Sequence, residues 1–149
     1  MKILKVLIIL VVCLSFTNCS NEDDSAQLRS QIYQLRYVED PSLLGKVIIS
    51  ENPDNSINIL MELNGTSSEV HPTFIYYNNL AQGGPVAITL DPCGCKVSNT
   101  RVTKLDNGTK ISFDELINFN GHLKVHRSEI HMETILLQGE IGKNARNIY

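Results

Sequence analysis

Apolar and polar residues alternate with a period of two in several short stretches of this chain, and this pattern constrains the fold more than any other feature. The clearest case is 57–63, whose apolar positions are Ile57, Ile59, Met61 and Leu63. Successive side chains of a strand point to opposite faces, so the pattern predicts a strand with one buried face. A turn sequence, Asn52-Pro53-Asp54-Asn55, precedes it and predicts a hairpin with the apolar-rich run 45–51.

The stretch 71–79 predicts the central strand. Ile75 and Tyr77 fall on one face and Phe74 and Tyr76 on the other. Apolar side chains on both faces are typical of a strand that is buried between two layers. Further strands are expected at 33–37, 86–90, 100–105, 109–111, 122–127 and around 135–141.

One short helix interrupts the strands. Ser112-Phe113-Asp114-Glu115 fits a capping box, and Phe113, Leu116 and Ile117 are spaced three and four apart. Short strands separated by turns, with a single helix, predict an all-β fold, an antiparallel Greek-key, immunoglobulin-like β-sandwich.

The N-terminus has the pattern of a signal peptide, with two lysines before the apolar run 6–16. That run is too short for a membrane-spanning helix, which needs about 20 residues. Ser15-Phe16-Thr17-Asn18-Cys19 resembles a bacterial lipobox, which implies cleavage before Cys19 and lipidation of Cys19. The stretch 20–24, which ends in Glu22-Asp23-Asp24, resembles the short acidic tether of bacterial surface lipoproteins. The alternative is ordinary cleavage near residue 19 and a secreted protein.

These features divide the chain into a leader (1–18), a lipidated cysteine with its tether (19–29), a folded domain (30–143) and a tail (144–149). The leader holds two of the 13 basic residues and none of the 16 acidic ones, so the remaining chain has a formal charge of −5. This balance argues against nucleic acid as a partner. The expected location is the bacterial outer membrane, lipid-anchored at the cell surface, with a periplasm-facing or secreted protein as the alternative.

Several short motifs, taken in order over roughly 30–143, resemble the bacterial chordin-type domain, the CHRD family. They are Asn64-Gly65, His71-Pro72, Tyr77-Asn78 with Gly83-Gly84, Ala87-Ile88-Thr89-Leu90, Thr103-Lys104-Leu105-Asp106-Asn107-Gly108, Phe119-Asn120-Gly121 with Val125-His126, and Gln138-Gly139-Glu140-Ile141-Gly142. Members of that family are secreted or surface-attached β-sandwiches without an established enzymatic activity. The resemblance implies the same for this chain.

Many such domains carry His-x-His on the central strand and a further histidine on a later Val-x-His strand, an arrangement similar to copper/zinc superoxide dismutase. Here Phe74 and Tyr76 stand at the two His-x-His positions. Phenylalanine cannot bind a metal and neutral tyrosine does so poorly, so the core of such a site is missing. No cofactor is expected, and His71 and His126 are the best remaining metal candidates.

Cys93 and Cys95 are separated only by Gly94. Cys13 leaves with the leader and Cys19 is the lipidation site, so these two thiols remain in an oxidising compartment. A loop-tightening disulfide is the expected state. An intermolecular bridge or a two-thiolate metal contact are the alternatives, and a strained disulfide would give a redox function some basis.

The chain shows no Gly-x-Ser-x-Gly motif, and its acidic residues are scattered. We therefore expect no enzyme, but a binding or structural module of the cell envelope. Its best contact surface is His71, Tyr76, Tyr77, Asn78 and Asn79, because amphipathic aromatics beside amides suit carbohydrate or protein partners. The same tyrosines would equally fit a core. The competing hypothesis is a metal-binding or thiol redox protein on a dismutase-like sandwich.

Overall fold

The computed structural model describes residues 28–64, 69–94 and 96–145. The leader, Cys19, most of the acidic tether and Cys95 lie outside the described residues, so the expectations that concern them remain predictions. Among the described residues no helix is long and apolar enough to cross a membrane.

Eight strands and one helix make up the described domain. In chain order they are β1 (Ser30–Tyr37), β2 (Leu44–Glu51), β3 (Ile57–Glu62), β4 (Val70–Tyr77), β5 (Val86–Gly94), β6 (Val97–Val102), α2 (Phe113–Ile117), β7 (Asn120–Ser128) and β8 (His131–Gly142). Most of the alternating stretches therefore form strands, and the all-β prediction is confirmed.

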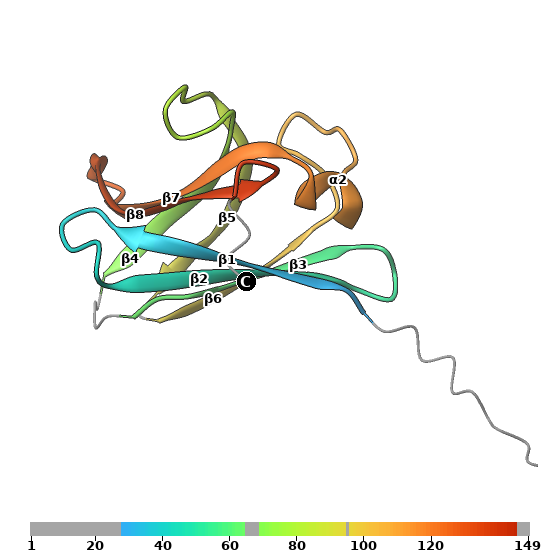
Figure 1. Cartoon of the computed structure of the whole chain (residues 1–149), viewed down its shortest axis with the longest axis horizontal. Coiled ribbons are helices and arrows are strands. Elements are labelled where there is room, and N and C mark those ends of the chain that lie inside the picture. Colours follow the sequence, from blue (N-terminus) through green and yellow to red (C-terminus); the bar gives the residue numbers. More distant parts are fainter. Residues whose placement is uncertain (1–27, 65–68, 95, 146–149) are drawn as a thin grey trace, which may run out of the picture.

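The strands form a single antiparallel sheet in the order β5-β4-β7-β8-β1-β2-β3-β6. The sheet curls on itself (Figure 1) until its two edge strands meet. There the Asp91 amide donates to Thr100 Oγ1 over 2.7 Å, and the Asp106 amide donates to the Ala87 carbonyl over 2.9 Å. The result is a nearly closed, barrel-like sheet.

The structure shows one continuous sheet rather than the two layers of a sandwich. The pairing of β1 with β8, through Arg36 opposite Gln138 and Tyr37 opposite Leu137, joins the two halves into one continuous sheet. A local alternation pattern predicts strands but not which strands pair, so it could not distinguish a sandwich from a curled sheet.

The inward faces of the strands enclose one apolar core. The side chains with no exposed surface include Leu35, Val47, Ile49, Ile57, Met61, Ile75, Leu116, Leu123, Val125, Leu137 and Ile141. The expected split of the central strand is confirmed in part. Ile75 lies in this core and Tyr77 packs against it, whereas Phe74 and Tyr76 lie half-buried on the outer face of β4. A single curled sheet has one interior, so no second layer covers them.

The predicted helix is confirmed as α2. Ser112 Oγ accepts from the Glu115 amide, and the Glu115 carboxylate accepts from the Ser112 amide, which completes the capping box. The hydrogen bonds from the Ser112 amide and hydroxyl to the carboxylate lower the pKa of Glu115. Phe113 and Leu116 are buried, and the helix lies at one end of the curled sheet (Figure 1).

Four local expectations need correction. Residues 109–111 do not form a strand, because only Lys110 forms an isolated bridge, with Lys104. The last strand, expected around 135–141, begins already at His131, and the strand expected at 86–90 extends far enough to include Cys93. Asn144 and Ala145, expected in a loose tail, are held by backbone bonds from their amides to the carbonyls of β8. Residues 146–149 lie outside the described part.

Arg29 ties the start of β1 to the end of β2 and to the helix. Its guanidinium contacts Glu51 at 2.8 Å and Asp114 at 2.6 Å, and lies 4.9 Å from the centre of the Phe113 ring. The hydrogen bond from Arg29 lowers the pKa of Glu51. A carboxyl whose pKa is lowered by folding stabilises the fold above its unfolded pKa, and this contribution disappears as the pH falls through the folded pKa.

We therefore expect Arg29→Gln to lower the urea midpoint at pH 7 and to have little effect in strong acid, once Glu51 is protonated. The effect is small because the ion pair is exposed to water. Urea titrations at both pH values test this. Arg36→Gln is the control because the exposed side chain of Arg36 bonds to the Pro41 carbonyl and, among the described residues, to no carboxylate. An equal loss at both pH values would assign the role of Arg29 to its packing on Phe113.

Candidate functional site

The outer face of β4 and β7 carries an aromatic–histidine cluster, formed by Phe74, Tyr76, His122, Lys124 and His126. The register places Tyr76 opposite His122 and Phe74 opposite Lys124. Directly opposite residues of antiparallel strands point to the same face, so these side chains must meet. Both histidines are buried, whereas the other three side chains are half-buried.

Tyr76 is the centre of the cluster. Its ring stacks on His122 with centroids 5.2 Å apart and an angle of 11° between the planes. The Lys124 ammonium lies 5.4 Å from the centre of the same ring. Burial raises the pKa of Tyr76, so at neutral pH it is a neutral phenol that can donate a hydrogen bond.

His126 connects the phenol to the backbone. Its Nδ1 bonds to the Met132 carbonyl, which can only accept, so Nδ1 carries the hydrogen in the neutral ring. Nε2 then accepts from the Tyr76 hydroxyl over 2.8 Å. Both nitrogens of His126 are thus occupied, and Tyr76 is held in one orientation.

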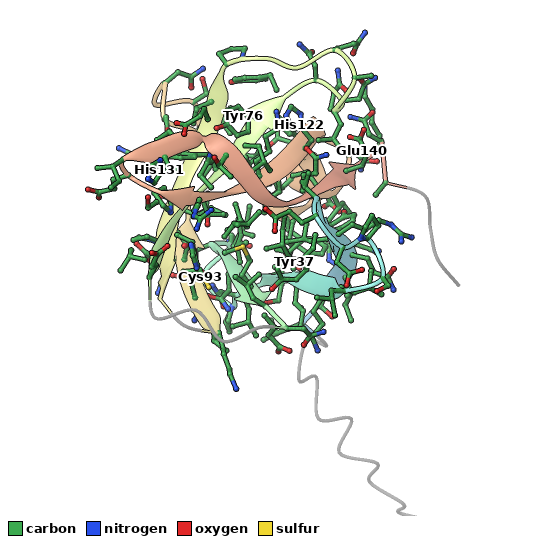
Figure 2. The ribbon with its side chains drawn as sticks, turned by 90° about the vertical axis from the view of Figure 1, so that its left-hand side faces the viewer. Tyr37, Tyr76, Cys93, His122, His131 and Glu140 are labelled. Atoms are coloured by element: carbon green, nitrogen blue, oxygen red, sulfur yellow. The ribbon has the colours of Figure 1, made fainter. Side chains whose placement is uncertain are left out.

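His122 is bonded on one side only. Its Nδ1 donates to the Asn78 carbonyl over 2.8 Å, while its Nε2 is buried without a hydrogen-bond partner in the described part of the chain. Opposite it on β8 stands Glu140, whose Oε1 accepts from the Leu80 amide and whose Oε2 is also buried without a partner. Figure 2 shows Tyr76, His122 and Glu140 along one side of the molecule, away from Cys93 and Tyr37.

The structure brings few of the predicted contact residues together. Of that set only Tyr76 belongs to the cluster, because Tyr77 points to the core side and packs against Phe119 with centroids 5.3 Å apart. Asn78 and Asn79 shape the following loop: Asn78 has a positive φ of 65°, which asparagine adopts more readily than most residues, and Asn79 Oδ1 accepts from the Gln82 amide.

The two metal candidates do not converge. His71 on β4 stands opposite the buried Cys93 on β5, and its Nδ1 donates to the Arg127 carbonyl over 2.7 Å. The alternation of β4 places His71 on the face of Thr73 and Ile75, opposite to the face that holds His126. Within the described part of the chain, no three histidine, cysteine or acidic side chains form a metal-binding group.

The predicted disulfide stays a prediction, because Cys95 lies outside the described residues. Cys93 itself is fully buried in the core. A loop-tightening bridge, an intermolecular bridge and a metal contact therefore remain the alternatives for this pair.

His122, Lys124 and Glu140 were not among the site residues predicted from the sequence. The spacing of His122, Lys124 and His126 in steps of two on one strand was a usable signal for a shared face. That this face meets Tyr76 and Glu140 depends on the pairing of β4, β7 and β8, which no local pattern contains.

Comparison with known proteins identifies no relative: no family model, no curated protein and no solved structure matches the chain.

A Tyr76→Phe substitution should destabilise the fold by about 1–3 kcal/mol, because it leaves the buried Nε2 of His126 without a partner. Urea denaturation measures this cost. Tyr37→Phe is the matched control, since its hydroxyl donates over 2.7 Å to the Asn64 carbonyl in an exposed setting that water can replace. Equal costs for the two variants would contradict a special role for the Tyr76–His126 bond.

Proposed function

We propose that this protein is a non-catalytic binding module of the bacterial cell envelope, anchored by a lipid on Cys19, whose outer β4–β7 face binds carbohydrate. The observation that carries the proposal is the fixed, half-exposed ring of Tyr76. Stacking on His122 and the bond to His126 set its orientation. A rigid aromatic ring with a polar edge loses little entropy when a ligand packs against it.

Polar groups beside the ring suit the hydroxyls of a sugar. The Lys124 ammonium can donate hydrogen bonds, and the half-buried Gln138 lies opposite Lys124 on β8 and can both donate and accept. Phe74, at an angle of 67° to the Tyr76 ring, extends the apolar part of the surface. An envelope protein is the other partner class for the same surface.

Recognition fits the described groups better than acid–base catalysis does. A catalytic acid or base needs an ionisable group with a proton ready to transfer near neutral pH. The pKa of Tyr76 is raised by burial, and both nitrogens of His126 are engaged. The thiol redox alternative depends on Cys95, outside the described residues.

The family and the finer topology are part of the same proposal. If β5 and β6 are counted as neighbours where the sheet closes, the order β7-β4-β5-β6 is that of a Greek key, three successive strands with the fourth beside the first. A β-rich barrel-like domain with one short helix is compatible with the chordin-type resemblance. We propose that relationship on the sequence motifs and this strand order.

Lipid anchoring makes a direct prediction. In bacteria that express the full chain and are fed an alkyne analogue of palmitate, we expect label on the wild type and on Cys13→Ala, and none on Cys19→Ala. Cys13 is the matched control because it would leave with the leader. Unlabelled wild-type protein in the medium would instead support ordinary cleavage and secretion.

For the binding surface, the full chain in detergent is applied to arrays of bacterial envelope polysaccharides. We expect Tyr76→Ala and Lys124→Ala to weaken binding at least about tenfold, equal to about 1.4 kcal/mol. Tyr76→Phe, which keeps the ring but loses the bond that orients it, should weaken binding less than Tyr76→Ala does. Lys110→Ala, an exposed lysine away from the cluster, should leave binding nearly unchanged.

Circular dichroism confirms that each variant is folded. Capture of an envelope protein on the same residues, without carbohydrate binding, would assign the surface to a protein partner. Binding of neither class by the folded wild type would overturn the proposal.

A further inference from the structure

His122 and Glu140 form a buried pair of hydrogen-bond acceptors. They stand directly opposite each other on β7 and β8, so both side chains lie on the same face of the sheet. His122 has no exposed surface, and the Oε2 atom of Glu140 is buried as well. Among the described residues, neither His122 Nε2 nor Glu140 Oε2 has a hydrogen-bond partner, so the two atoms do not bond to each other either.

Each side chain is held by a bond on its other polar atom. The Nδ1–H of His122 donates to the Asn78 carbonyl, which leaves a lone pair on Nε2. Oε1 of Glu140 accepts from the Leu80 amide, which leaves Oε2 available. Metal-binding histidines are held in this way, with the second ring nitrogen donating to a carbonyl or carboxylate, and metal-binding carboxylates are likewise hydrogen-bonded.

Two buried acceptors without a donor are costly, and the cost is largest for a carboxylate. A cation at this position would bind to both and balance the charge of Glu140. An imidazole nitrogen with a carboxylate oxygen suits Zn²⁺, whereas Ca²⁺ and Mg²⁺ prefer oxygen ligands throughout.

We propose that His122 Nε2 and Glu140 Oε2 bind a divalent transition-metal ion, with Zn²⁺ as the ion that fits. Two protein ligands leave the remaining positions to water, so the affinity is modest. Asn78 and Leu80 belong to the segment that follows β4, so ligand orientation depends on this segment lying against β7 and β8. The site does not depend on what the Tyr76 surface binds. A buried water that donates to both acceptors is the competing occupant.

The test is a Zn²⁺ titration of the full chain in detergent, freed of metal with a chelator, in competition with a fluorescent zinc indicator. We expect one ion per chain, and binding weakened at least about tenfold by His122→Gln and by Glu140→Gln. His131→Gln is the matched control. His131 and Glu133 also form a histidine–carboxylate pair, with Nδ1 3.4 Å from Oε1, but this pair is exposed to solvent. This variant should bind as the wild type does.

A second measurement does not depend on the variants being folded. In the wild type, Zn²⁺ should shift the ¹⁵N resonance of His122 Nε2 and leave that of His126 Nε2, which accepts from Tyr76, nearly unchanged. Binding that is insensitive to both His122→Gln and Glu140→Gln, or lost in His131→Gln, overturns the proposal. No binding at micromolar Zn²⁺ also overturns it and leaves water as the occupant.

Discussion

The antiparallel pairing of β4 with β7 is the contact on which the rest of this structure depends. On its inner side it places Ile75 opposite Leu123, and both side chains are fully buried in the core. On its outer side the same register places Tyr76 opposite His122. A shift of one residue would exchange the two faces and bring the histidines into the apolar interior. Core burial therefore sets the geometry of the outer cluster.

The outer face of β4 and β7 holds the buried histidines His122 and His126, which lie outside the apolar core. His126 meets its hydrogen-bonding needs through Tyr76 and the Met132 carbonyl, so its burial is compensated. His122 and Glu140 each have one satisfied and one unsatisfied atom. Buried polar networks stabilise a structure when all members are satisfied and are costly otherwise. This difference separates the two proposals. The Tyr76–His126 bond is complete and fixes a ring that faces outward, whereas the His122–Glu140 pair has two unsatisfied atoms that a bound ion would satisfy.

The two proposed sites share one scaffold but lie at different depths. Tyr76 and Lys124 are half-buried and accessible to a ligand in solution, whereas His122, stacked on the Tyr76 ring, is fully buried. An ion at His122 would reinforce the stacking partner of Tyr76. Different side chains carry the two sites, so variants of Tyr76 and Lys124 test the surface and variants of His122 and Glu140 test the buried pair.

The sequence by itself determined most of the strands, the helix and its cap, because side-chain alternation and the Ser112–Glu115 box are local properties of the chain. It also singled out Tyr76, which the structure places at the centre of the outer cluster. It did not determine that the strands form one curled sheet, since pairing β8 with β1 requires contacts between the two ends of the domain. The partnership of Tyr76, His122 and Glu140 was decided only by tertiary structure. These residues come from β4, β7 and β8, and only the strand order and register bring their side chains to one face.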